Sequence, residues 1–75
     1  MFAMEILPVF SPSALIEFRH AKGMSQEELA RAAGLATVTV AKLEEGRKRD
    51  PRSSTLAKLA GALGCSVGQL MGSSQ

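Results

Sequence analysis

Two segments of this chain carry the same helix-start signature, and that repeat restricts the fold more than any other feature. In Ser25-Gln-Glu-Glu28 and in Ser66-Val-Gly-Gln69, a serine stands three residues before a Glu or a Gln. This is the spacing of a capping box, in which each side chain accepts a hydrogen bond from the other residue's backbone N–H. Apolar residues occupy the hydrophobic-staple positions around both serines: Met24 with Leu29, and Cys65 with Leu70. The pattern predicts helices over residues 26–33 and 66–71.

Apolar stripes predict two further helices. One stripe has the i, i+3, i+4, i+7 spacing of an amphipathic helix and consists of Leu56, Leu59, Ala60 and Leu63. It predicts a helix over residues 54–63, capped by Ser53 or Ser54 and ended by Gly64. A second stripe follows Pro12-Ser13 and consists of Ala14, Leu15, Phe18 and Ala21. It predicts a helix over residues 13–22.

The stretch between these helices gives conflicting signals. Thr37-Val-Thr-Val40 alternates polar and apolar β-branched residues, as a half-buried strand does. Residues 41–45 are good helix formers and are followed by Gly46. A strand here would have no partner, because every other segment is predicted to be helical, so we expect a helix over residues 37–45. Helical spacing gives this helix two faces: Val40 and Leu43 toward the core, Val38 and Lys42 outward.

Size and composition limit the function. A chain of 75 residues makes one small domain with one core. With one Cys and one His it has no cluster at metal-ligand spacing and no internal disulfide. No nucleophile–base pair marks a catalytic site, so we expect no enzyme, no metal and no cofactor. We divide the chain into an apolar N-terminal arm (1–12), a helical domain (13–71) and a flexible tail (72–75).

Positive charge is concentrated in the second half of the chain. Residues 37–75 hold six of the nine Lys and Arg residues, against three acidic ones, within a net charge of only +2. Four of the six fall in the segment Arg47-Lys-Arg-Asp-Pro-Arg52. Such a segment is either a solvated loop or a contact for a polyanion, and a partner such as nucleic acid agrees with the second interpretation.

Several motifs together are more specific than any one of them. They are Gly23-Met-Ser-Gln-Glu-Glu-Leu-Ala30, Ala33-Gly-Leu35, Val40-Ala-Lys-Leu-Glu-Glu-Gly46, Thr55-Leu-Ala-Lys-Leu-Ala60 and Leu63-Gly-Cys-Ser66. In this order they make residues 13–71 resemble the phage repressor/Cro type of helix-turn-helix DNA-binding domain, also called the xenobiotic-response-element type. The resemblance implies an all-α fold, a compact five-helix lambda-repressor-like domain. It also implies a sequence-specific transcriptional regulator, a repressor that binds a palindromic operator in double-stranded DNA as a homodimer, through the major groove.

The resemblance also implies roles for individual residues. The positions that contact bases fall on Thr37, Val38 and Lys42, with Thr39 at the margin. The positions that contact phosphates fall on Gln26 and on the basic segment, at Arg47, Lys48, Arg49 and Arg52. Val38 is apolar on a polar face, so its expected partner is a thymine methyl group. Each assignment has a plainer alternative: Val38 as an isolated exposed hydrophobe, Gln26 as an ordinary surface residue.

Two further positions concern structure. Arg19 and Glu44 match a pair that forms an internal salt bridge in relatives, so we expect them to join the first helix to the third. Where the family usually has Ser or Thr, this chain has Ala36. Alanine removes the side-chain cap of the third helix, so that helix begins either at Thr37 or one residue later.

The N-terminal arm and the last helix are the candidate dimer contacts. Eight of residues 1–12 are apolar and none is basic, so a role in the minor groove is not expected. The arm either packs on its own core, packs on a second subunit or is an unstructured leader. In the last helix, Val67, Leu70 and Met71 either contact a partner or close the core of the monomer.

Two other functions stay open. A protein-interaction module, such as the antitoxin of a toxin–antitoxin pair, would use the apolar arm to bind a protein partner. A restriction–modification controller would bind DNA with the same fold. No apolar run approaches the ~20 residues that span a bilayer, so we expect a cytoplasmic, nucleoid-associated protein without membrane contact.

Overall fold

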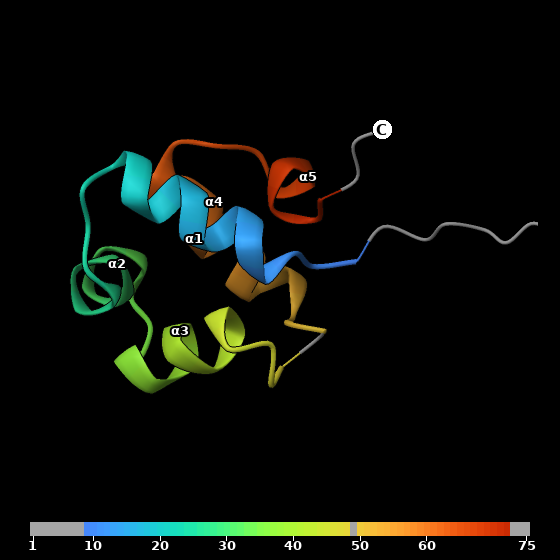
Figure 1. The fold of residues 1–75 in the computed structure, drawn as a ribbon, viewed down its shortest axis with the longest axis horizontal. Coiled ribbons are helices and arrows are strands. Elements are labelled where there is room, and N and C mark those ends of the chain that lie inside the picture. Colours follow the sequence, from blue (N-terminus) through green and yellow to red (C-terminus); the bar gives the residue numbers. More distant parts are fainter. Residues whose placement is uncertain (1–8, 49, 73–75) are drawn as a thin grey trace, which may run out of the picture.

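The computed structural model of the chain describes residues 9–48 and 50–72. Within these residues the chain forms five helices and no strand: α1 Pro12–Ala21, α2 Gln26–Ala33, α3 Thr37–Glu44, α4 Ser53–Leu63 and α5 Val67–Leu70 (Figure 1). Each helix lies within one residue of its predicted bounds. The predicted all-α, five-helix fold is confirmed.

Both predicted capping boxes are formed. At the start of α2, the Ser25 hydroxyl accepts from the Glu28 N–H at 3.0 Å, and the Glu28 carboxylate accepts from the Ser25 N–H at 2.8 Å. Ser66 and Gln69 make the same reciprocal pair at the start of α5, at 3.0 and 2.9 Å. These bonds satisfy backbone donors that have no partner within the helix.

Two other helix starts differ from the prediction. Helix α1 begins one residue early because the Ser11 hydroxyl caps it, accepting from the Ala14 N–H at 3.1 Å, with Pro12 in the first turn. Proline suits that position because its missing N–H would have no helical partner. Helix α4 starts after Arg52, whose side chain makes no capping bond. The prediction that Ser53 or Ser54 caps α4 is therefore wrong, because Ser53 already lies inside the helix.

Helix α3 contains the strand-like sequence. It begins at Thr37, and Ala36 precedes it in an extended conformation without a side-chain capping bond. Val40 and Leu43 have no exposed surface at all, so the burial of this helical face outweighs the weak helix propensity of the β-branched residues.

Every helix contributes to one core. Six side chains are fully buried, namely Leu15, Leu29, Val40, Leu43, Leu59 and Leu70. Phe10, although it precedes α1, is also buried at 5% exposure. The Ser11 N–H donates to the Leu70 carbonyl at 2.9 Å, which holds the start of the folded chain against its end. Phe10 and Pro12, which the sequence assigned to the arm, are thus part of the folded domain.

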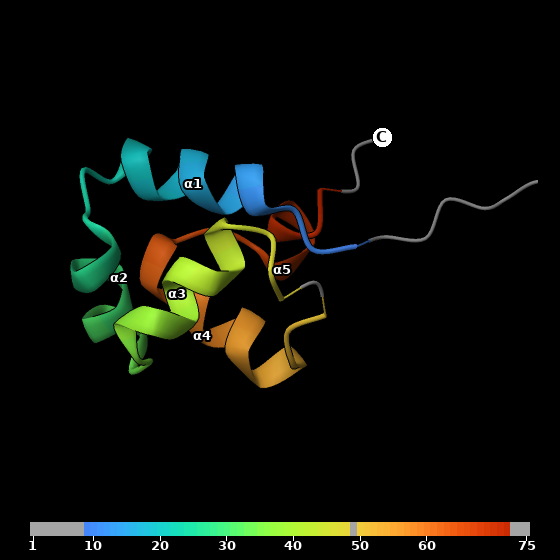
Figure 2. The same cartoon turned by 60° about the horizontal axis from the view of Figure 1, so that its bottom comes forward.

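The helices are arranged so that α3 lies on the outside of the molecule. It packs against α1 and α2, while α4 packs against α2 and α5. The second view brings α3 to the front, with α1 above it and the chain leading to α4 beside it (Figure 2). None of the described helices is long and apolar enough to cross a membrane.

Candidate nucleic-acid interface

Helices α2 and α3 form a helix-turn-helix unit. Helix α2 ends at Gly34, whose φ of 71° is in the left-handed region that glycine adopts without strain. The Leu35 N–H then donates back to the Ala30 carbonyl at 2.8 Å, and Leu35 packs against the core. A three-residue turn, residues 34–36, therefore joins two helices that pack directly on each other.

The outer face of α3 carries the predicted base-contacting residues. Thr37, Val38 and Lys42 are exposed, Val38 to 57%, and Thr39 is half-buried. Val38 and Lys42 are four residues apart and so are neighbours on the helix surface. The structure places a methyl-rich side chain and a long cation side by side on a helix whose other face is fully buried.

A network of side chains fixes the orientation of α3. The ion pair expected between Arg19 and Glu44 is present and bidentate: Arg19 Nε and Nη2 lie 2.6 and 2.9 Å from the two carboxylate oxygens of Glu44. Arg19 Nη1 also donates to the Met24 carbonyl at 2.8 Å. Gln26 Nε2 donates to Glu44 Oε1 at 2.9 Å. Glu44 thus receives hydrogen bonds from α1 and α2 together.

The network perturbs the ionisation of both charged groups. Burial alone would raise the pKa of Glu44, but the hydrogen bonds from Arg19 and Gln26 outweigh it and hold this pKa below its usual value. The hydrogen bond to Glu44 raises the pKa of Arg19 further. Both groups therefore stay charged at neutral pH. Because Glu44 lies at the C-terminal end of α3, where the helix dipole disfavours an anion, its partners also offset that repulsion.

The contact between Gln26 and Glu44 was missed from the sequence. Gln26 was expected at a phosphate, but its side-chain amide N–H is directed to Glu44. Its backbone N–H, in the first turn of α2, stays a predicted phosphate contact. No local pattern marks the Gln26–Glu44 bond, because it joins residues on different helices whose approach depends on how α2 and α3 pack.

The basic segment lies in the loop between α3 and α4. Arg47 Nε donates to Glu45 Oε1 at 2.8 Å, with both side chains more than half exposed. Such a surface pair contributes little to stability. Lys48 and Arg52 are exposed, while Arg49 lies outside the described residues. Arg47 and Lys48 therefore follow closely after α3, and Arg52 lies at the other end of the loop, directly before α4.

The predicted dimer residues divide into two kinds. Leu70 is fully buried, so its assignment to an interface is wrong: it closes the core of the monomer. Val67 is 37% exposed and Met71 is half-buried, so both are accessible to a partner. Cys65 packs against the core, and burial raises the pKa of its thiol, which makes the reactive thiolate scarce. Among the described residues, no group of acidic, His or Cys side chains could hold a metal.

A helix-turn-helix family model matches residues 15–70 of this chain, which include all of α2, α3 and α4. The chain is a helix-turn-helix protein. The resemblance found in the sequence is thereby confirmed. No curated protein sequence matches the chain.

Solved structures of transcription regulators share the fold of this helix-turn-helix protein. The restriction–modification controller protein C.AhdI from Aeromonas hydrophila is 37% identical, with a TM-score of 0.74 over 79% of this chain and 88% of that one. SinR, a master regulator of biofilm formation solved in complex with DNA, is 30% identical, with a TM-score of 0.78 over 80% and 98% of the two chains; it comes from Bacillus subtilis. The clp gene regulator ClgR is 39% identical, with a TM-score of 0.70 over 79% and 75%; it comes from Corynebacterium glutamicum.

Proposed function

We propose that this helix-turn-helix protein is a transcriptional regulator that binds a specific double-stranded DNA site with α3 in the major groove. The observation that carries the proposal is the exposed face of α3, where Val38 is 57% exposed beside Lys42 while Val40 and Leu43 are fully buried. An eight-residue helix is about 12 Å long, and the groove is about 12 Å wide. A helix of this size can therefore be accommodated in the groove.

Each exposed residue of α3 has a chemically suitable partner on DNA. The methyl groups of Val38 match the thymine methyl group. Thr37 can exchange hydrogen bonds with a base edge or a phosphate, and Lys42 can donate to guanine. Thr39, which is half-buried, is the marginal member of this set.

Phosphates would bind on both sides of α3. On one side, Arg47 and Lys48 follow α3 and are exposed. Arg52 precedes α4, a position where the helix dipole disfavours a cation and a bound phosphate would offset that repulsion. On the other side, Ala36 leaves the first N–H groups of α3 without a side-chain cap, and a helix N-terminus attracts phosphate. Arg49 and the backbone of Gln26 complete the proposed set.

We further propose that the protein is a repressor acting on a palindromic operator as a homodimer. One recognition helix contacts only a few base pairs, so two half-sites about one DNA turn apart supply the specificity. As such a regulator it would act in the cytoplasm, on the nucleoid. A restriction–modification controller is the second candidate, favoured by the 37% identity to C.AhdI. No catalytic role is part of either proposal.

Selection of bound duplexes from a random pool tests the proposal. We expect an enriched palindrome, bound with an affinity that falls steeply as salt rises, because phosphate contacts release counterions. The double variant Thr37→Ala, Lys42→Ala is the matched control: it should keep most of the salt-dependent affinity and show a weaker sequence preference, since Val38 remains. If no duplex is retained even at low salt, the regulator hypothesis fails and a protein-interaction module becomes the better explanation.

A further inference from the structure

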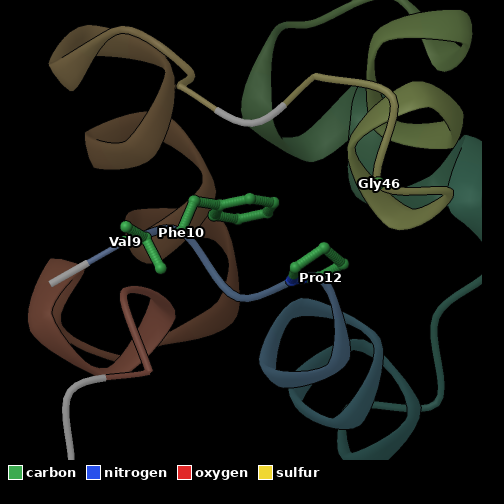
Figure 3. Close-up of a pocket in the computed structure, with 4 residues that line it drawn as sticks. All are labelled: Val9, Phe10, Pro12 and Gly46. Carbon is green, nitrogen blue, oxygen red and sulfur yellow. The ribbon is translucent and has the colours of Figure 1, made fainter. Parts of the chain in front are cut away.

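An apolar pocket opens where the N-terminal segment enters the folded domain. It has a volume of about 220 Å³ and is lined by Val9, Phe10, Pro12 and Gly46. Figure 3 shows the rings of Phe10 and Pro12 directed toward the chain that carries Gly46, with Val9 on the far side of Phe10. Val9 is 64% exposed, more than the other large hydrophobic residues of the described chain.

The pocket has the size and chemistry for one large apolar side chain. An apolar protein cavity of about 150 Å³ holds a benzene molecule, so this pocket can take an aromatic or branched aliphatic group. Among the described residues, no charged side chain lines it. A charged occupant would therefore lose its hydration without gaining an opposite charge from the described lining.

The chain itself carries a segment of matching chemistry at the edge of this pocket. The eight residues before Val9 are Met1-Phe-Ala-Met-Glu-Ile-Leu-Pro8, of which six are hydrophobic and one is charged. Fully extended, eight residues reach about 26 Å. That reach is enough to cross to a neighbouring molecule whose pocket faces the same interface.

Return of the segment into its own pocket is disfavoured by the sequence next to Val9. Proline limits its own φ to a narrow range and disfavours the helical region in the residue before it, and Pro8 directly precedes Val9. The bond from the Ser11 N–H to the Leu70 carbonyl fixes the chain two residues later. The sequence thus disfavours a tight reversal next to Val9, whereas a second molecule can be reached without one.

We propose that residues 1–8 of one copy insert an apolar side chain into the pocket of a second copy, and that the second copy does the same in return. A two-fold axis between the copies makes the exchange reciprocal. The inference rests on the proposed function only in taking the protein to be a dimer. It assigns to that dimer an interface made by the arm, which was one of the two candidate dimer contacts in the sequence, and it names the pocket that the arm enters.

Two neighbouring features agree with an interface at this end of the molecule. Helix α5, which contains the accessible Val67 and is followed by Met71, lies beside the start of α1 in both views (Figures 1 and 2). The pocket also includes Gly46, which directly precedes Arg47 and Lys48. An inserted side chain would contact the loop that is proposed to bind phosphate. The dimer interface and the DNA-binding surface would therefore both include this loop.

Paramagnetic relaxation in mixed samples tests the exchange without DNA. In a Cys65→Ala background, Met4→Cys provides a thiol on the arm to which a nitroxide is attached, in protein that contains no ¹⁵N. This sample is mixed with ¹⁵N-labelled protein that carries no nitroxide. We expect loss of the amide signals of Phe10 and Gly46 in the ¹⁵N-labelled copy. Met4 is close to Phe10 in the sequence, so loss is expected in any case when the nitroxide and ¹⁵N share one chain. Loss in that sample and none in the mixed sample would show that the arm does not reach a second copy. That result would overturn the proposal.

Sedimentation of full-length variants supplies the energetic test. The double change Ile6→Asn, Leu7→Asn should raise the dimer dissociation constant about tenfold or more, because apolar side chains no longer leave water on association. Glu5→Gln is the matched control, since it alters the same segment and keeps its apolar groups. Unchanged dimerisation of the double variant would contradict the inserted arm. Neither test uses DNA, so the result of each test does not depend on whether the protein binds DNA.

Discussion

Arg19 and Glu44 lie 25 residues apart in the sequence and form a bidentate ion pair between α1 and α3. Their side chains are 12% and 5% exposed. Because Arg19 also binds the Met24 carbonyl and Glu44 also binds Gln26, one charged pair joins α1, the chain leading to α2, α2 itself and α3. This pair sets the angle at which α3 faces DNA in the proposed function.

Removing one member of this pair should be costly. In Glu44→Gln the Arg19 guanidinium stays buried without a counter-charge, so the free energy of unfolding should fall by about 3–5 kcal/mol. Urea denaturation measures this free energy of unfolding. The control is Glu27→Gln, which removes an exposed contact with Arg31 at 3.9 Å and should change stability by less than about 0.5 kcal/mol. Equal effects of the two changes would contradict a structural role for Glu44.

The same pair should make stability depend on acidity. The pKa of Glu44 is held below its usual 4.5 in the folded state, so the fold favours the charged carboxylate. This stabilisation is complete above the pKa of the unfolded chain and is lost as the pH falls through the lower pKa of the folded state. The difference in unfolding free energy between the wild type and Glu44→Gln should therefore narrow below about pH 4.5. A difference that stays constant on acidification would contradict the lowered pKa.

The missing cap of α3 predicts opposite effects on stability and binding. Ala36→Ser supplies a hydroxyl to the first turn of α3 and should stabilise the protein by about 1 kcal/mol. If phosphate uses the same N–H groups, DNA binding should weaken because the serine occupies them. Thermal denaturation and a duplex titration measure the two effects. The converse control is Ser25→Ala, which removes a formed cap and should destabilise by a similar amount.

Lys48 should contribute affinity without sequence preference. Lys48→Ala is expected to weaken binding to all duplexes alike and to reduce the slope of log affinity against log salt by about one. Lys58→Ala removes an exposed lysine of α4 instead and should leave the slope unchanged. Equal slopes for Lys48→Ala and the wild type would exclude Lys48 from the footprint.

Val38 should determine which base is preferred at one position of the DNA site. Val38→Gln replaces a partner for thymine methyl with a side chain that pairs with adenine, so duplex selection should return a different preferred site. The fold should be unaffected, because this side chain is 57% exposed. Ala57→Gln, at an exposed position of α4, is the control and should return the original site. The same site from Val38→Gln would show that Val38 does not contact the base.

Local sequence determined the helices. Two short-range patterns determined them: the capping boxes at Ser25 and Ser66, and the apolar stripe of α4. Each acts over three or four residues, so it can be recognised in the sequence alone. The errors were also local: α1 begins at Pro12 and α4 at Ser53, each one residue before the predicted start. Serines near both starts were possible caps, but only α1 uses one, Ser11, whereas α4 follows Arg52 without a side-chain cap.

Tertiary structure decided what short-range patterns leave open. Thr37–Val40 is strand-like as an isolated string, and it is helical because Val40 is fully buried where α3 packs on α1 and α2. Leu70 has the same chemistry as an interface residue, and only packing against the core shows that no partner can contact it. The bond from Gln26 to Glu44 and the pocket beside Phe10 likewise join residues far apart in the chain. Such contacts depend on the relative positions of whole helices, which sequence spacing does not specify.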